Sequence, residues 1–279
     1  MIRIVTDSSC DLPDEILERH RVTVVPLTIR FGEESFVDRE QLSVDDFWVR
    51  LGAAQDLPET AAPSVGRFQD AYRDLSDAGA DGIVAVMISA GISATYQSAS
   101  LASDQLRSGI PVRVIDSGLV SAALGLGVLA AARAAEAGGT IDDVEATARD
   151  AVVSSNLFAA LDTLEYLKKG GRIGSIAAFF GNLLDVKPLI TFADGVVSAG
   201  GRVRTRRKAI KAVLDHLESL ESVAEVGVVH SNPPDLDEFL SALGERGHND
   251  PLVARLGPVV GTHTGPGVIG IVYRLSESD

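Results

Sequence analysis

Only one cysteine, Cys10, occurs among the 279 residues, and aromatic side chains make up 5% of them. One cysteine cannot form a disulfide within the chain or supply a zinc site made of several thiolates, and such sparse usage is typical of a reducing cytoplasm. We therefore expect Cys10 to be a small buried residue and the protein to be cytoplasmic.

Positive charge is also scarce, because 25 lysines and arginines stand against 39 aspartates and glutamates, for a formal net charge of -14. Such a chain repels the phosphates of nucleic acids and of anionic membranes. The apolar segment from Leu119 to Ala135 is too short to span a bilayer and contains two glycines, which favours a buried helix. We expect no nucleic-acid partner and no stable membrane insertion.

Several motifs that mark nucleotide or catalytic sites are missing. The chain has no phosphate-binding loop of the nucleoside-triphosphatase type, no paired-glycine dinucleotide fingerprint after Val5 and no serine nucleophile elbow. Its five histidines lack the spacing of metal ligands. These absences argue against an enzyme that works alone and predict neither a cofactor nor a metal site.

Strands and helices alternate through the first half of the chain. Apolar runs predict strands at residues 2–5, 22–29, 82–88 and 112–115. Helix starts are indicated at Asp11, at Ser43, at Ser64 and after Ser93, and an alanine-rich helix follows the last strand. This alternation predicts a parallel sheet covered by helices on both faces.

The second half has a different pattern. Asp194 and Gly195 separate two β-like runs and predict a two-residue hairpin, hence antiparallel pairing. A helix at residues 205–220, a strand at 226–229, a helix at 236–243 and strands around His263 complete a mixed α+β pattern. The length suggests two domains, and we expect an α/β fold with a parallel-sheet domain at 1–155 and a mixed domain at 156–279.

Three polar loops follow predicted strands and open helices: residues 6–9, 89–93 and 116–118. Hydroxyl groups and helix N-termini at the carboxyl ends of parallel strands suit an anionic group, although helix capping is the commoner role of any one such loop. Thr60 adds a hydroxyl that capping does not explain, because it lies ahead of the helix that Ser64 opens.

One histidine and two basic clusters also invite a binding role. His263 lies in a run of glycines and prolines beside an apolar segment, where the backbone can approach a ligand closely. Lysines and arginines gather at residues 168–172 and 202–208 of an otherwise acidic chain. Such clusters can receive phosphate or the acidic surface of a partner, although solvated helix ends often look the same.

Taken in order, these segments resemble the DegV family, whose members include the fatty-acid-binding subunit (FakB) of bacterial fatty-acid kinase. The resemblance covers the chain from end to end and is carried by eight segments: residues 5–9, 60–64, 88–96, 116–117, 167–173, 187–188, 203–205 and 263–267. It implies a two-domain α/β protein that holds one long-chain fatty acid, such as palmitate, in a buried tunnel with its carboxylate near the domain junction.

The resemblance also implies roles for single residues. Thr60 and Ser93 would hold the carboxylate, and His263 would lie beside it. Arg172 and Arg204 would face the place where a separate ATP-dependent kinase delivers phosphate to form an acyl-phosphate. The chain departs from the family pattern at two positions, where serine and glycine are frequent: Ala61 and Ala94.

Two other functions remain open from the sequence. A hydrolase or transferase could use Ser93 as its nucleophile and His263 as its base, and a binder of a phosphorylated metabolite could use the basic clusters. The wall of a lipid tunnel is not readable from sequence, but one apolar series suits either a tunnel or the core: Phe158, Ile173, Ile176, Phe179, Phe180, Leu183 and Leu184.

Overall fold

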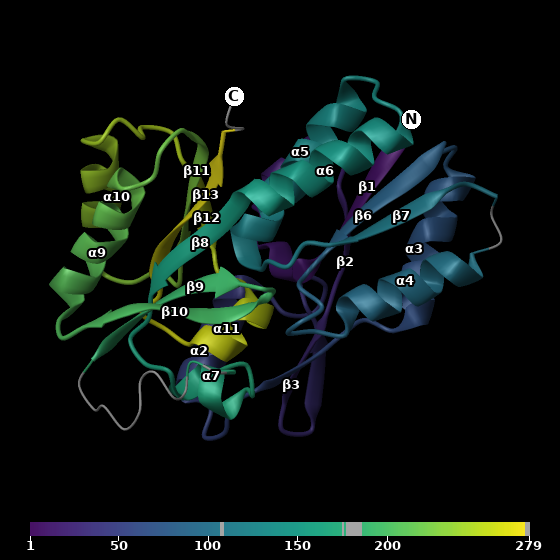
Figure 1. Ribbon diagram of the computed structural model, residues 1–279. Coiled ribbons are helices and arrows are strands. Elements are labelled where there is room, and N and C mark those ends of the chain that lie inside the picture. The colour runs from purple at the N-terminus through teal and green to yellow at the C-terminus, as the bar shows by residue number, and fades with distance from the viewer. Residues whose placement is uncertain (107–108, 175, 177–185, 277–279) are drawn as a thin grey trace.

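The computed structural model describes residues 1–106, 109–174, 176 and 186–276. Their strands form a four-stranded parallel sheet, a six-stranded mixed sheet and a small three-stranded antiparallel sheet. Figure 1 shows the two larger sheets side by side, with helices α5 (Ser121–Glu136) and α6 (Ile141–Ser154) between them and further helices on their outer faces. The result is an α/β fold built of alternating helical and sheet layers.

The parallel sheet has the strand order β2-β1-β6-β7. Its strands are β1 (Ile2–Asp7), β2 (Thr23–Val25), β6 (Gly82–Met87) and β7 (Val112–Asp116). Every residue of β6 is buried, as expected for a central strand that is covered on both faces. Helices α3 (Val65–Asp77) and α4 (Thr95–Gln105) cover one face, and α5 and α6 cover the other. The predicted parallel sheet is confirmed.

The six-stranded sheet has the order β10-β9-β8-β13-β11-β12, and β11 pairs with β12 in parallel while the other pairs are antiparallel. Its strands are β8 (Ser155–Ala160), β9 (Lys187–Ala193), β10 (Val196–Val203), β11 (Val223–His230), β12 (Leu252–Arg255) and β13 (Ile269–Leu275). The hairpin between β9 and β10 is confirmed: Asp194 and Gly195 have φ values of 51° and 74°, as a tight hairpin of this kind requires.

Side chains of this sheet alternate between two environments. One face packs against α9 (Arg206–Glu218) and α10 (Leu236–Gly244), which lie on the outside of the molecule (Figure 1). The opposite face turns towards α5 (Ser121–Glu136) and α6 (Ile141–Ser154) and joins the apolar core of the parallel sheet. We call these the outer face and the inner face of the six-stranded sheet.

Helix α5 is the predicted alanine-rich helix, and it is buried along most of its length between the two larger sheets. Small residues allow its neighbours to approach closely. A Cβ atom on Gly125 would lie 2.8 Å from Leu12 Cδ2, and one on Gly127 would lie 2.4 Å from Val152 Cγ1. One hydrophobic core cluster contains residues of α5 together with residues of both larger sheets. No helix of the described chain is both long enough and apolar enough to cross a membrane.

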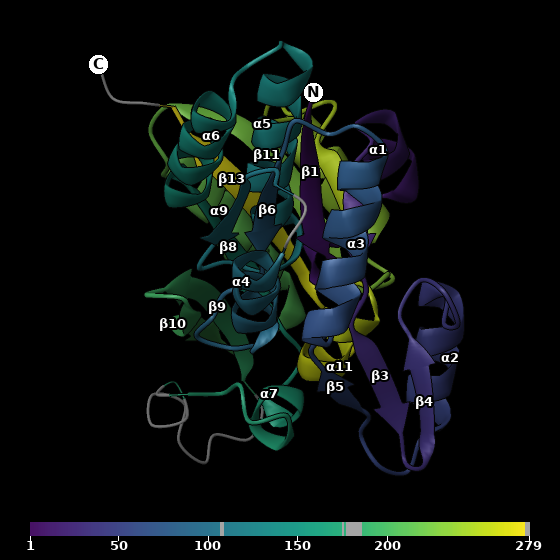
Figure 2. The ribbon, with the colours of Figure 1, turned by 90° about the vertical axis from the view of Figure 1, so that its right-hand side faces the viewer.

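The predicted strand at residues 22–29 is wrong, because it is two strands in different sheets. β2 ends at Val25, and β3 (Thr28–Phe31) pairs with β4 (Glu34–Val37) and β5 (Glu59–Ala61) in the small sheet. Pro26 has no N–H to continue the first ladder, and the amide of Leu27 instead donates to Ser8 Oγ over 3.1 Å. Helix α2 (Val44–Ala53) packs beside this small sheet (Figure 2).

Two expected element ends also differ. Asp11 does not cap a helix, because α1 (Asp14–Arg19) starts after Pro13 and Asp11 ends the short 3-10 turn at Ser8–Cys10. His263 is not flanked by strands on both sides: it lies in the last turn of a short helix, α11 (Pro258–Thr264). Proline in the first turn and Gly265 after the last residue, with φ of 69°, provide the start and stop signals.

Cys10 is fully buried, as predicted, and burial raises the pKa of its thiol to about 12. The predicted domain boundary between residues 155 and 156 coincides with the start of β8. The shared core cluster lies on both sides of that point, so the division into 1–155 and 156–279 stays a prediction.

Candidate functional site

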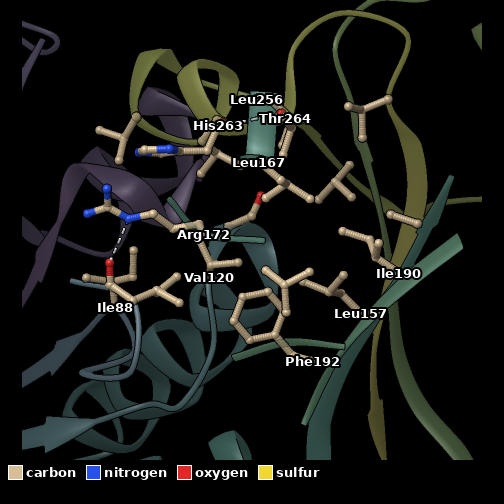
Figure 3. A pocket seen from close by; sticks show the side chains of 18 of the residues that line it. Ile88, Val120, Leu157, Leu167, Arg172, Ile190, Phe192, Leu256, His263 and Thr264 are labelled. Atoms are coloured by element: carbon tan, nitrogen blue, oxygen red, sulfur yellow. Dashed lines mark hydrogen bonds between the residues drawn. The ribbon is translucent and has the colours of Figure 1, made fainter. Parts of the chain in front are cut away.

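A cavity lies between the inner face of the six-stranded sheet and the loops that follow the parallel strands (Figure 3). Most of its described lining is apolar, and these residues come from both halves of the chain: Leu27, Ile88, Ile92, Val120, Leu157, Ala159, Leu161, Leu167, Ile190, Phe192, Val197, Val229, Leu256, Val259, Val260 and Val268. Such a wall favours a hydrocarbon over a polar ligand.

The strand period of two explains the wall on the sheet side. Leu157 and Ala159 on β8 line the cavity, as do Ile190 and Phe192 on β9. The residue between the first two, Phe158, points to the outer face and packs in the cluster with α9 and α10. One strand therefore supplies both a ligand wall and a packed core.

His263 and Thr60 lie together at the polar end of the cavity. Thr60 is the central residue of β5, and its Oγ1 lies 2.9 Å from His263 Nε2. Burial, and next the charge of Arg172, lowers the pKa of His263 to about 4, so the imidazole is neutral at pH 7. Its Nδ1 is buried and has no hydrogen-bond partner among the described residues.

Arg172 brings a positive charge to the same end. Its Nε donates to the carbonyl of Ile92 over 3.2 Å, and its Nη1 donates to the carbonyl of Gly170 over 2.8 Å. Figure 3 shows Arg172 beside His263, opposite Leu157, Ile190 and Phe192. Arg172 is the only charged side chain in the described lining, so the cavity has one cationic end and one apolar end.

Ser93 also lines the cavity, and its hydroxyl forms hydrogen bonds in the turn before α4, whose N-cap residue is Ala94. Its Oγ lies 2.9 Å from Thr95 Oγ1 and accepts from the Thr95 amide over 3.3 Å at the start of α4. The Ser93 hydroxyl therefore both lines the cavity and accepts a backbone hydrogen bond at the start of α4. Thr60, Ser93, Arg172 and His263 come from four separate elements and meet in one cavity.

Arg204 lies apart from this group. It follows β10 on an exposed turn and is not among the described lining residues. The two departures from the family pattern adjoin the site. Ala61 follows Thr60 on β5, and Ala94 precedes the first residue of α4.

Two of the three polar loops serve internal structure. Asp7 accepts from the amides of Ser9 and Ile88 over 3.0 and 2.8 Å, and Asp116 accepts from the amides of Ala90 and Gly118, both over 3.0 Å. Of the three loops, the one at residues 89–93 is the one whose residues appear in the described lining. Internal hydrogen bonding explains the other two.

The apolar series from the sequence is mostly core where the structure describes it. Phe158 lies on the outer face, Ile176 is buried in the shared core, and Ile173 packs against that core, but none of the three appears in the described lining. Phe179, Phe180, Leu183 and Leu184 lie outside the described residues.

Sequence reasoning missed two hydroxyls in the wall, Ser121 and Thr264. The sequence did not mark Ser121 as a cavity residue, because a serine at the start of an alanine-rich helix is ordinary. Asp11, its hydrogen-bond partner, resembled a helix cap. The described residues hold no group of three or more metal-ligating side chains.

Comparisons with known proteins agree on one family. A family model described as "Uncharacterised protein, DegV family" matches residues 1–275. A DegV domain-containing protein of Streptomyces coelicolor is 37% identical over 279 residues, or 97% of each chain. A structure described as fatty acid binding of a DegV family protein from Thermus thermophilus has a TM-score of 0.87 and 32% identity over 99% of each chain. A stearic acid-binding protein from Eubacterium ventriosum has a TM-score of 0.88 and 30% identity over 98% of each chain.

Proposed function

Because the chain belongs to the DegV family, we propose that it binds one long-chain fatty acid, such as palmitate, with the acyl chain in the cavity and the carboxylate at its polar end. The observation that carries this proposal is the uneven wall of the cavity. Its described lining is apolar apart from a few hydroxyls and the group at one end that contains Thr60, Ser93, Arg172 and His263. That division matches the two parts of a fatty acid.

The tail supplies most of the affinity. Each buried methylene contributes about 0.8 kcal/mol, so the roughly fourteen methylenes of palmitate give about 11 kcal/mol of gross driving force. Association itself costs at least about 4 kcal/mol, and only the surplus appears as affinity. A soluble carrier with an apolar cavity can therefore hold a fatty acid without a covalent bond.

The polar end fixes the orientation of the ligand. The hydroxyls of Thr60 and Ser93 can donate to a carboxylate, and the Arg172 guanidinium supplies the opposite charge. Each charge-assisted hydrogen bond adds only about 1.5 to 3 kcal/mol, because the carboxylate gives up its hydration. Neutral His263 holds Thr60 through the contact of 2.9 Å.

The carrier then presents the carboxylate to a separate ATP-dependent kinase. A carboxylate oxygen forms a bond to the γ-phosphorus, the bond from that phosphorus to the bridging oxygen breaks, and ADP leaves, so that an acyl-phosphate remains. Arg172 and His263 assist by stabilising negative charge at the carboxylate, and Arg204, outside the described lining, faces the phosphate that the kinase delivers. This role belongs to fatty-acid and phospholipid metabolism in the cytoplasm, and the chain acts as substrate carrier, not as the enzyme.

Contacts in the cavity argue against the two alternative functions, a hydrolase or transferase that uses Ser93 and a binder of a phosphorylated metabolite. The contact of His263 Nε2 is with Thr60, and Ser93 Oγ contacts Thr95, so the two side chains do not form a nucleophile–base pair. A phosphorylated metabolite would leave most of the apolar wall unused. A fatty acid uses both ends.

Native mass spectrometry of the freshly purified protein tests the ligand. We expect one fatty acid per chain, identified after denaturing extraction. A mass without ligand, together with failure to take up added palmitate or oleate, would overturn the proposal.

A double variant tests the carboxylate site. Thr60→Ala with Ser93→Ala removes two donors, and we expect palmitate affinity to fall about 10-fold or more without being abolished. The control is Ser117→Ala, which removes a buried hydroxyl outside the described lining. Unchanged affinity in the folded double variant would rule out this carboxylate site.

Reconstitution with a partner kinase tests the presenting role. We expect His263→Ala and Arg204→Ala to slow acyl-phosphate formation at saturating palmitate. Arg207→Ala, an exposed arginine in the first turn of α9, is the matched control for Arg204. Full turnover by both variants would remove these two residues from the mechanism.

A further inference from the structure

A second polar feature lies in the cavity wall, formed by Ser121 and Asp11. Ser121 is the first residue of α5 and lines the cavity. Its Oγ donates to Asp11 Oδ2 over 2.6 Å, and Asp11 Oδ1 accepts from the Gly257 amide over 2.9 Å. The Asp11 side chain is buried. Each carboxylate oxygen thus has a protein donor, and the proton of Ser121 is directed into the wall.

This pair is separated from the carboxylate end of the cavity. Gly257 precedes the first residue of α11, whereas His263 lies six residues later, in the last turn. At 1.5 Å per residue, that separation is about 9 Å along the helix axis. No hydrogen bond joins Ser121 to Thr60, Ser93 or Arg172 among the described residues. Asp11 and Ser121 are therefore held near the start of α11 and His263 near its end, and in the proposed carrier this places Ser121 beside the acyl chain.

The backbone holds this arrangement in an unusual geometry. Asp11 and Ser121 both have left-handed conformations, with φ of 52° and 57°. Residues other than glycine adopt this region at a cost, so surrounding contacts must hold them there. The hydrogen bond between the two side chains is one such contact, and it fixes the direction of the Ser121 hydroxyl.

The hydroxyl of Thr264, the residue that follows His263, is oriented in the same way. Thr264 Oγ1 donates to the carbonyl of Val260 over 3.0 Å, within its own helix. Ser121 and Thr264 thus both direct their protons to protein acceptors, and each keeps oxygen lone pairs that can face the cavity. At Ser121 and Thr264, the described wall therefore offers the ligand a hydrogen-bond acceptor, and the hydroxyl proton of each residue is already engaged by the protein.

We propose that Ser121, oriented by Asp11, forms a subsite for a hydroxyl group on the acyl chain, so that the ligand class includes hydroxylated long-chain fatty acids. The inference rests on the proposed fatty-acid carrier function. A ligand hydroxyl donates to Ser121 Oγ and stays satisfied inside an apolar cavity. A keto group can only accept, so it meets an acceptor and is buried without a partner, which is unfavourable.

The test compares three sets of ligands by isothermal titration calorimetry. They are stearic acid, stearic acids with one hydroxyl at each carbon from the sixth to the twelfth, and the matching keto acids. Burial raises the pKa of Asp11 to about 7, so titration at about pH 8.5 keeps the carboxylate ionised. At one or two adjacent positions, we expect the hydroxy acid to bind about 10-fold or more tightly than its keto counterpart.

Two variants separate the subsite from general effects of chain polarity. Ser121→Ala removes the acceptor, and we expect the preference for hydroxy over keto acid at that position to disappear. Asp11→Asn places an amide nitrogen where Oδ2 was, and that nitrogen donates to Ser121 Oγ. The Ser121 proton is then free for the ligand, and we expect the keto acid to gain affinity at the same position.

Ser117→Ala is the control, because this buried hydroxyl donates to the carbonyl of Leu119 over 3.3 Å and is not in the described lining. It should keep the preference of the parent chain. The subsite would be overturned if hydroxy and keto acids bound equally at every position, or if the preference survived Ser121→Ala. In either case, binding of stearic acid would still support the fatty-acid carrier function. Failure of stearic acid itself to bind would overturn both proposals.

Discussion

The two faces of the six-stranded sheet carry similar residues and serve different purposes. On the outer face, Phe158 stacks on His216 at a ring-centroid distance of 4.0 Å and packs in a closed core. On the inner face, Phe192 and Leu157 border a cavity. Apolar composition alone therefore does not mark a ligand wall. What distinguishes the inner face is that its neighbours leave space.

The largest expected effect is on the outer face. Phe158→Ala removes a buried ring that α9 encloses, and we expect the free energy of unfolding of the empty protein to fall by about 3 to 5 kcal/mol. Denaturant titration measures this loss. Palmitate affinity, measured where the variant is folded, should change little. A large loss of affinity would show that the two faces are not separate.

The matching change on the inner face should mainly alter binding. Phe192→Ala removes apolar contact with the acyl chain, and burying such a ring is worth about 1.5 to 3 kcal/mol. We expect palmitate affinity to fall about 10- to 100-fold. The loss of unfolding free energy should be smaller than for Phe158→Ala, because the ring already borders space. Equal destabilisation with unchanged affinity would contradict the division of faces.

A smaller change adds volume to the outer face. A Cβ atom on Gly200 would lie 2.5 Å from Phe158 Cε2, so Gly200→Ala should overpack this core and cost about 1 to 3 kcal/mol of unfolding free energy. Thermal unfolding with and without palmitate separates stability from binding. Stabilisation by palmitate should match that of the parent. A selective loss of that stabilisation would instead link Gly200 to the cavity.

The smallest effect concerns the polar end. The pKa of His263 is about 4 in the folded chain and 6.5 when unperturbed, because burial, and then Arg172, disfavours the charged ring. Between these values the unfolded chain binds the extra proton, so the contribution of neutral His263 to stability is full above pH 6.5 and falls as pH drops towards 4. We expect the difference in unfolding free energy between parent and His263→Gln to shrink by about 1 kcal/mol from pH 7 to about pH 5.7. A difference that does not depend on pH would contradict this assignment.

Local signals predicted much of the fold. The Asp194–Gly195 hairpin and three of the four predicted parallel strands, at residues 2–5, 82–88 and 112–115, depend on neighbours in sequence, and these predictions were correct. The errors came from distant contacts. Pro26 passes the chain from one sheet to another, and Asp11, which looked like a helix cap, is bonded to Ser121 110 positions away. The residues next to Asp11 in the sequence give no indication that its partner is Ser121.

The site was only partly predictable for the same reason. The resemblance to the DegV family selected Thr60, Ser93, Arg172 and His263, and all four line the cavity. Their separations depend on four elements whose relative positions no single segment specifies. Arg204 came from the same resemblance and lies elsewhere. Ser121 required the structure, because a serine at the start of an alanine-rich helix has no special pattern.

The position of α5 between the two larger sheets has a consequence for how the protein unfolds. Because its small residues belong to a core that both sheets share, neither half can lose α5 and keep a complete interior. We expect one cooperative transition, with the slowest-exchanging amides of β6 and β8 opening together. A fragment cut at residue 155 would expose the apolar surfaces of α5 and α6 that the six-stranded sheet covers, and it should aggregate instead of folding as an independent domain.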